Sequence, residues 1–399
     1  MKKSFPVIFV EINDLNYTFV AGVYDNNQNL KIIEKKVIAN VGMSKNKFTD
    51  IIIAQEVIKK NIQSIENKLD YIFKEVIVIL DFFNFFCLNL SGFKKLNGSQ
   101  VLEENISHIL NSIKQTVTEN EKENTILHIF NSKNILDETI VENLPIGLFG
   151  NFYNHELTFF LINNNDLKNI KQIFNKIDLK IKKILLKSFV EGAYLTNRDN
   201  NKDSFFKIKV SKERSQLSIF EKSSFRYVEH FDFGTDIILK DIAKVCSIDS
   251  DFIHKILLDR FLENKDFKED ELLEKKYFTK INYRKIKKKL IMDIAKARIQ
   301  EIANIILKKN INLNLYKKDI KKIYIIIEED LIFDNFKENF KLYFSQNLDS
   351  DTQLINTFEI DSLIISASNL SNYGWKKEAI PITPTKNTLI SKIFKVLFG

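Results

Sequence analysis

Glycine and proline are scarce in this chain. Its 399 residues include 10 glycines and 4 prolines, whereas glycine makes up about 7% of an average protein. Loops that hold the phosphates of a nucleotide depend on glycine, because its backbone reaches conformations that other residues avoid and lets a ligand approach closely. The shortage therefore argues against nucleotide chemistry of the usual kind.

Cysteine clusters and long apolar runs are also missing from the sequence. Cys87 and Cys246 stand at unrelated positions and predict neither a disulfide framework nor a metal site. No stretch approaches the roughly 18 apolar residues of a membrane-spanning helix, and the run Val7–Val10 is too short for a secretory signal. The five histidines are scattered, with no serine, histidine and aspartate set. We therefore expect a cytoplasmic protein with no catalytic residues and no bound metal.

Charge is slightly basic, with a formal net charge of +8. Lysine is abundant together with asparagine, isoleucine and phenylalanine, so a lysine run carries little meaning by itself. We interpret Lys285–Lys289 as the solvated start of a helix that buries Ile286, Leu290, Ile294 and Ala297. The sequence thus predicts no nucleic-acid partner.

Two parts of the chain repeat one pattern, three strand-like runs followed by a helical one. The strand-like runs are Val7–Ile12, Tyr17–Val23 and Leu30–Val37 in the first part, and Phe205–Val210, Gln216–Phe220 and Arg226–Phe233 in the second. A helical pattern follows in each part, from Phe48 to about Leu69 and from Thr235 to Val245. The repetition predicts an α/β fold made of two duplicated halves that face each other across a cleft.

The last twelve residues form a strongly amphipathic pattern. At helical spacing, one face carries Leu389, Ile390, Ile393, Phe394, Leu397 and Phe398, and the other carries Lys392 and Lys395. The preceding residues 371–387 are polar, include Pro381 and Pro384, and predict a flexible linker. We interpret 388–399 as a membrane-surface helix that binds weakly as one copy, because ordering its backbone offsets most of the gain from burial. The alternative is a terminal helix docked on the protein's own core.

Several segments, taken in order, resemble the bacterial cell-division protein FtsA, an actin-like protein. They are Leu127–Phe130, Asp137, Asn143–Gly150 and His155–Leu157 in the first part, Phe231–Gly234 with Asp241–Ala243 and Lys296–Ile302 in the second, and the amphipathic tail. The resemblance implies an actin-like fold with a small inserted subdomain. It divides the chain into a first half (1–90, with 156–196 returning to it), the inserted subdomain (91–155), a second half (197–370), the linker and the terminal helix.

The resemblance also implies a function and partners. Members of this family polymerise and tether the FtsZ ring to the membrane, so the expected partners are the C-terminal peptide of FtsZ, further copies of the chain and the lipid surface of the inner membrane. The expected location is the cytoplasmic side of that membrane at the division septum. Alternatives are an actin-like adaptor of another membrane assembly, such as pilus biogenesis, and an ATP-dependent small-molecule kinase.

The family's ATP and Mg²⁺ are expected ligands, yet the matching positions of this chain are poorly suited to them. The first phosphate hairpin has Glu11, Asn13 and Asp14 where the family places an aspartate and a glycine-containing turn. The second has Lys209 and Ser211 and no glycine, and a lysine cannot coordinate Mg²⁺. The predicted cleft also contains Gly234, Arg298, Glu301, Glu328 and Glu329, the last two in place of an adenine-side glycine pair.

We therefore predict a degenerate nucleotide site in which the Lys209 ammonium faces the Glu11 carboxylate. The alternative is that nucleotide binding is intact and one motif has been misplaced.

Overall fold

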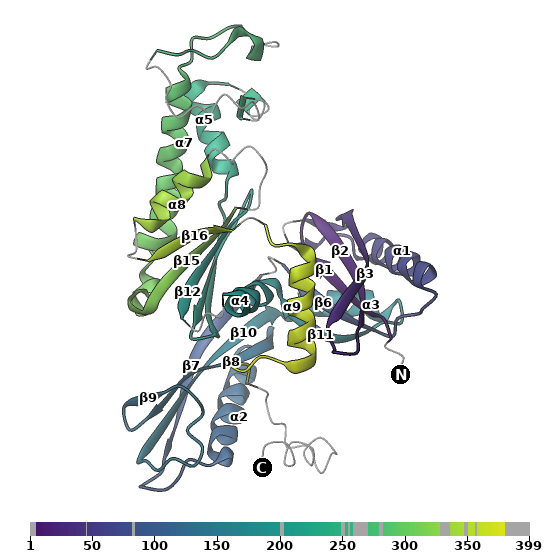
Figure 1. Ribbon diagram of the computed structural model, residues 1–399, viewed down its shortest axis with the longest axis vertical. Helices are drawn as coiled ribbons and strands as arrows, with labels where there is room; N and C mark the ends of the chain where they lie inside the picture. The colour runs from purple at the N-terminus through teal and green to yellow at the C-terminus, as the bar shows by residue number, and fades with distance from the viewer. Residues whose placement is uncertain are drawn as a thin grey trace. The chain divides into compact units, whose positions relative to one another are not determined.

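The computed structural model (Figure 1) describes residues 5–44, 46–81, 84–199, 203–248, 252–253, 256–257, 270–278, 282–327, 336–346, 350–355 and 357–379. The chain divides into two compact units. Unit 1 comprises residues 1–9, 20–34 and 185–372, and unit 2 comprises 10–19, 35–184 and 373–399.

Unit 1 contains a five-stranded sheet in the order β14-β13-β12-β15-β16. The first three strands, β12 (Ser204–Val210), β13 (Ser215–Glu221) and β14 (Ser224–Phe231), form an antiparallel meander. β15 (Ile320–Ile327) pairs with β12 in parallel, and β16 (Asp351–Ile355) pairs with β15 in parallel. Every residue of β12 and β13 is buried, as expected of strands covered on both faces.

Helices cover both faces of this sheet (Figure 1). α5 (Asp236–Cys246), α7 (Lys288–Ala303) and α8 (Lys337–Ser345) share one apolar core with alternate residues of β12 such as Phe206 and Ile208. On the other face, α4 (Lys187–Arg198) meets Phe220 and Phe225. α9 (Ile360–Tyr373) is bonded to α4 through the Ser366 hydroxyl, which donates to the Val190 carbonyl at 3.2 Å.

A second five-stranded sheet has the order β11-β6-β1-β2-β3. Its strands are β1 (Val7–Ile12), β2 (Asn16–Tyr24), β3 (Leu30–Ala39), β6 (Glu75–Leu80) and β11 (Lys180–Leu186). In both sheets the third, second and first strands of a meander are followed by two later strands. The duplicated α/β fold predicted from the repeated pattern is confirmed.

A four-stranded sheet, in the order β7-β10-β8-β9, forms the inserted subdomain of unit 2. β7 (Phe85–Lys95), β8 (Asn124–Leu136) and β10 (Phe152–Asn163) are long, and β9 (Thr139–Val141) is short. α2 (Glu103–Asn120) covers one face and shares a core with Tyr153, Leu157 and Phe159. Because β7 and β10 pair along eleven residues, from Phe85 to Lys95, the sheet extends beyond the expected bounds of 91 and 155.

The remaining elements are two helices of unit 2 and several short segments. α1 (Ile51–Leu69) begins where the Asp50 carboxylate accepts from the backbone N–H groups of Ile52 and Ile53, each at 3.0 Å, a standard N-cap. α3 (Asn164–Asn175) is capped in the same way by Asn163. The short elements are β4 (Met43–Ser44), β5 (Lys47–Phe48), η2 (Lys275–Tyr277), the π-helical turn η3 (Asn304–Lys308), η4 (Ile311–Leu315) and η5 (Lys317–Asp319).

The buried face of α7 differs from the one predicted for the Lys285–Lys289 region. The helix buries Lys288, Ile291, Ala295 and Ile299, whereas Leu290 is 42% exposed. Ile286 is buried as predicted, although it lies before the helix. Inside the helix the buried positions fall at Ile291 and Ala295 instead of Leu290 and Ile294, because the packing of α7 sets its rotation. The Lys288 side chain is accommodated by an ion pair with Glu271 at 2.6 Å.

Candidate functional site

The first hairpin, between β1 and β2, is closed by its own side chains. The Asn13 side-chain oxygen accepts from the backbone N–H groups of Leu15 at 2.9 Å and Asn16 at 2.7 Å. The Asn13 backbone N–H donates to the Asn16 carbonyl at 3.2 Å. Because phosphate-binding hairpins grip their ligand with backbone N–H groups, the turn has these three donors already engaged.

The other two predicted residues of this hairpin also have internal partners. The Glu11 carboxylate, 6% exposed, accepts from the Asn13 side-chain amide at 3.1 Å. The Asp14 carboxylate accepts from the backbone N–H of Asn46. Glu11 and Asn13 are thus bonded to each other within the turn, whereas Asp14 bonds to Asn46 in a different segment.

The second hairpin, between β12 and β13, packs against the start of α5. The backbone N–H of Thr235 donates to the Ser211 carbonyl, and that of Asp236 to the Lys212 carbonyl, each at 2.9 Å. A Cβ on Gly234 would lie 2.0 Å from the Ser211 carbonyl oxygen. Gly234 is therefore required for this close packing, in which the first amides of the helix, an ordinary anion site, bond to the hairpin instead.

Lys209 belongs to a buried charge cluster that the sequence did not reveal. The Glu191 carboxylate on α4 is 3.9 Å from the Lys209 ammonium and closer still to that of Lys207. The exposed fractions are 2% for Glu191, 0% for Lys207 and 1% for Lys209. Two lysines at alternate positions of a buried strand signal a carboxylate partner, but its place on α4 depends on the packing.

Arg298 and Glu301, also assigned to the cleft, form a charged network on the helices of unit 1. Arg298 on α7 pairs with Asp241 on α5, and with Glu301 one turn along α7 at 2.7 Å. The hydrogen bond to Asp241 raises the pKa of the Arg298 guanidinium above its ordinary value. Arg298 therefore joins α7 to α5, and Glu301 pairs with it within α7.

Part of the predicted site lies outside the described residues. The undescribed part comprises Glu328, Glu329 and the eight predicted membrane-helix residues, which are Leu389, Ile390, Lys392, Ile393, Phe394, Lys395, Leu397 and Phe398. Glu11 belongs to unit 2 and Lys209 to unit 1, so their pairing stays a prediction.

The first residues of the expected linker are structured. α9 continues to Tyr373, and Gly374 ends it with a φ of 71°. Residues 375–379, which we call the strap, then run antiparallel to β8 with a bridge between Glu378 and Phe130. The Lys377 carbonyl accepts from Asn131 N–H and Ala379 N–H donates to the Ile129 carbonyl, each at 2.7 Å. A flexible linker can therefore begin only after Ala379, because backbone pairing fixes the preceding residues.

A buried carboxylate holds the strap. Glu378 contacts His128 Nδ1 at 2.8 Å and Lys183 Nζ at 3.2 Å. Burial by itself would raise the pKa of Glu378, but the hydrogen bond and charge of His128, with Lys183, hold it below its ordinary value. The Lys377 ammonium donates to the Glu142 carbonyl at 2.7 Å. Sequence reasoning did not bring these residues together, and it named His128 only within the segment Leu127–Phe130.

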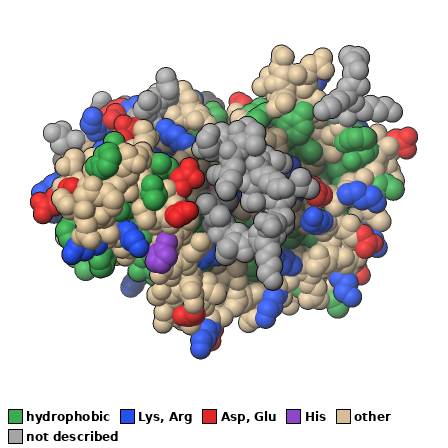
Figure 2. Space-filling view, turned by 90° about the horizontal axis from the view of Figure 1, so that it is seen from below, with side chains coloured by type: hydrophobic (Ala, Val, Ile, Leu, Met, Phe, Trp, Pro, Cys, Tyr) green, Lys and Arg blue, Asp and Glu red, His purple; other side chains and the backbone are tan. Residues whose placement is uncertain are grey.

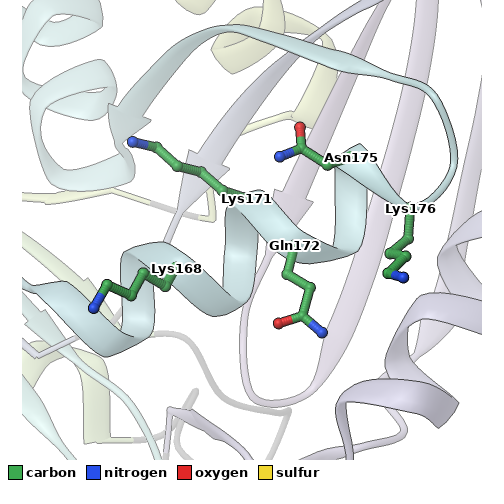
Figure 3. Close-up of a pocket in the computed structure, with 5 residues that line it drawn as sticks. All are labelled: Lys168, Lys171, Gln172, Asn175 and Lys176. Carbon is green, nitrogen blue, oxygen red and sulfur yellow. The ribbon is translucent and has the colours of Figure 1, made fainter.

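The described surface also has depressions. One, of about 420 Å³, lies on α3, with Lys168 and Lys171 toward one end of its lining and Lys176 at the other end (Figure 3). Its lining residues are exposed lysines and amides. Another, of about 410 Å³, lies after β16 and is lined by residues that include Tyr194, Arg198 and Phe358. The Tyr194 and Phe358 rings meet edge to face, with centroids 5.6 Å apart.

Charges are mixed on the face of the molecule seen from below. Figure 2 shows Lys and Arg side chains apart from one another, among acidic and apolar side chains. Within the described ranges, no three His, Cys, Asp or Glu side chains are placed to hold a metal ion. Among the described helices, none combines the length and apolar character needed to span a membrane.

Comparison with solved structures identifies the fold. A chain of the PilM-PilN type IV pilus biogenesis complex matches with a TM-score of 0.53 and 9% identity, covering 93% of this chain and 97% of that one. The ethanolamine utilization protein EutJ from Carboxydothermus hydrogenoformans matches with a TM-score of 0.45, 9% identity and coverage of 93% and 90%. MreB5 of Spiroplasma citri bound to ADP matches with a TM-score of 0.45, 10% identity and coverage of 92% and 95%.

This chain has the actin-like ATPase fold. The duplicated sheet order carries this conclusion, together with the match to the pilus protein over nearly the whole of both chains. No protein-family model and no curated protein matches the sequence. The comparisons with solved structures therefore show the fold of this chain.

Proposed function

We propose that this protein is a membrane-associated adaptor of the FtsA type, built on an actin-like body that does not grip a nucleotide in the conventional way. One observation carries the second part of the proposal, the Asn13 side chain bonded to the N–H groups of Leu15 and Asn16. A phosphate could bind there only after these bonds were broken. A body without a phosphate grip is suited to assembly and tethering rather than to ATP-driven chemistry, which also argues against a small-molecule kinase.

Self-assembly is supported by the outer face of the inserted sheet, opposite α2. The register places Phe93, Asn154, Ile135 and Ile140 opposite one another across all four strands, hence on one face. Phe93 is 76% exposed and Ile140 57% exposed, and the neighbouring Phe152 is 52% exposed. Exposed apolar groups of this size mark interaction surfaces, and in the proposal the partner is a second copy of the chain.

Sedimentation of the full chain tests this interface. We expect Phe93→Glu to shift the protein toward monomer at concentrations where the unchanged chain associates. Leu315→Glu is the matched control, since Leu315 is 83% exposed in unit 1 and its replacement should leave association unchanged. Equal association of all three proteins would contradict the proposal that the outer face of the inserted sheet binds a second copy.

The membrane part of the proposal depends on the sequence pattern of residues 388–399. In the proposed arrangement their apolar face inserts into the cytoplasmic surface of the inner membrane at the division septum, and the body binds the C-terminal peptide of FtsZ. Several assembled copies would bind lipid far more strongly than one, because each later insertion is intramolecular.

Vesicle sedimentation tests the anchor. The full chain, with phosphatidylglycerol and phosphatidylethanolamine vesicles, should pellet with lipid, whereas the double variant Phe394→Glu, Leu397→Glu should lose at least tenfold in vesicle affinity, because charges would replace two inserted side chains. Ser391→Gln, on the polar face, is the control and should bind as the unchanged chain does. Equal pelleting of all three proteins would contradict the anchor.

A second candidate is an adaptor of pilus biogenesis. The match to the PilM-PilN complex over 93% of this chain favours it. Fluorescence anisotropy with a labelled C-terminal peptide of FtsZ separates the two candidates. Micromolar binding supports the division adaptor, and absence of binding at 100-fold higher peptide concentration supports the pilus candidate.

A further inference from the structure

The strap completes an edge of the inserted sheet that another strand leaves open. β9 pairs with β8 at Asn134–Leu136, and the strap takes over the same edge of β8 at Ile129–Asn131. The strap therefore extends the sheet as an additional short strand. Two backbone hydrogen bonds and the small buried side chain of Ala379 hold it there.

Glu378 makes two charged contacts that hold the strap, besides the bond from the Lys377 ammonium to the Glu142 carbonyl. The Glu378 side chain is 13% exposed and meets His128, which is 1% exposed, and Lys183, which is 27% exposed. Hydrogen bonds between charged groups are stronger than neutral ones, and a carboxylate that is buried without its partners is costly. Of the other strap residues, Lys376 is exposed, Trp375 and Lys377 are half-buried, and Ala379 is buried in the core of the subdomain.

We propose that the strap is a releasable latch that sets the length of the C-terminal tether. With the strap docked, backbone pairing to β8 extends to Ala379. With the strap released, the fixed backbone would end at Gly374, whose positive φ ends α9. Release thus adds residues 375–379, about 17 Å of extended chain at roughly 3.3–3.6 Å per residue, and uncovers the backbone of β8 at residues 129–131.

The geometry favours release as a unit over gradual fraying. Glu378 lies between the two strap residues whose backbones bond to β8, and its carboxylate reaches partners on two different strands, β8 and β11. Losing these contacts removes the bond that aligns the flanking Lys377 and Ala379 with β8. The latch itself is independent of lipid, while its effect on membrane reach rests on the proposed function.

Amide hydrogen exchange of the full chain, without lipid, tests the latch. In Glu378→Gln, which keeps the shape and removes the charge, the N–H groups of Asn131 and Ala379 should exchange about tenfold faster or more, as expected from loss of charge-assisted hydrogen bonds. The N–H of Phe130 should not change, because alternate residues of β8 direct their backbone groups to β10. Glu75→Gln, which alters an exposed pair with Lys180, is the matched control.

Two results would overturn the latch. Unchanged exchange at Asn131 and Ala379 would show that Glu378 does not hold the strap. Faster exchange at Phe130 as well would show that the strap is a structural strand whose loss unfolds the subdomain. Trypsin provides a second measurement, since cleavage after Lys377 should be faster in Glu378→Gln than in Glu75→Gln.

A second experiment, with lipid vesicles, distinguishes failure of the latch from failure of the proposed function. With a fluorophore on the body and an acceptor in phosphatidylglycerol vesicles, Glu378→Gln should show weaker energy transfer than the unchanged chain, because its tether is longer. If neither protein binds vesicles while the exchange result stands, the anchor fails and the latch is retained. If both bind with equal transfer, the inferred change in reach is wrong.

Discussion

At the scale of single residues, buried polar groups explain most of what is unusual in this chain. The Asn13 side-chain oxygen accepts from the amides of its own turn. Glu191 neutralises part of the charge of Lys207 and Lys209 inside unit 1. The Glu191 case follows the rule that a buried charge requires a partner, while the Asn13 bonds lie in a partly exposed turn.

Glu191→Gln should destabilise the protein by about 3 kcal/mol or more, because two buried lysines lose the carboxylate between them. Urea unfolding followed by circular dichroism measures the change. Glu75→Gln is the control, since its pair with Lys180 is exposed on both sides and such pairs contribute about 0–1 kcal/mol. A similar small effect for both variants would show that the cluster does not depend on Glu191.

His155 should make the inserted subdomain sensitive to acid. It is fully buried, and burial lowers its pKa from 6.5 to about 4. The unfolded chain therefore binds the proton more readily, so this stability is complete above pH 6.5 and is lost as the pH falls toward 4. Between pH 7.5 and 5 we expect a loss of about 2 kcal/mol, calculated from the two pKa values.

Urea unfolding at the two pH values measures this loss, with His155→Phe expected to reduce it. His108 lies on the exposed side of α2, so His108→Phe serves as the control and should keep the pH dependence of the unchanged chain. If His155→Phe kept it as well, the acid sensitivity would come from other groups.

At the scale of elements, close contact between α4 and the sheet of unit 1 depends on glycine. A Cβ at Gly192 would lie 1.9 Å from a ring atom of Phe220, far inside normal contact. Phe220 in turn stacks on Phe205 and Phe225, with centroids 5.0 and 4.7 Å apart. The helix and the aromatic layer therefore fit together only where a side chain is absent.

Gly192→Ala should cost about 1–3 kcal/mol or more through overpacking, read as a lower midpoint of thermal unfolding. The double variant Gly192→Ala, Phe220→Leu should recover part of the loss, because the smaller side chain makes room for the methyl group. Asn197→Ala, at an exposed position of the same helix, is the control. If the midpoint of thermal unfolding did not recover in the double variant, the destabilisation would not come from a clash with Phe220.

At the scale of the whole molecule, the duplicated sheets give the actin-like fold. In the two hairpins where we predicted altered phosphate sites, described backbone groups bond within the chain, and we propose that this chain keeps the fold without the ligand chemistry usual for it. This agrees with the general rule that a fold does not fix a function, which depends on the residues of a site.

Mg-ATP at 1 mM should raise the unfolding midpoint of the full chain by less than about 1 °C. A site with a Kd of about 10 μM would stabilise the protein by about 2.7 kcal/mol at this concentration, which corresponds to a shift of several degrees. Mg²⁺ with sodium pyrophosphate serves as the control for unspecific effects of the anion. A shift of several degrees in the unfolding midpoint with Mg-ATP would show that the chain binds nucleotide in the conventional way.

The sequence by itself determined the strands of both meanders and their repetition, because period-two patterns between turn residues are local signals. It also indicated the altered hairpins, since Asn13 and Lys209 cannot do the work of glycine and aspartate. These features depend on residues close together along the chain.

Only the tertiary structure decided which distant residues meet. The pairing of Glu378 with His128 and Lys183, of Glu191 with Lys209, and of Arg298 with Asp241 joins elements separated by many residues. It also decided that 371–379 is structured and which face of α7 is buried. The physical reason is that partner choice and helix phase follow from packing, which periodicity along the sequence does not encode.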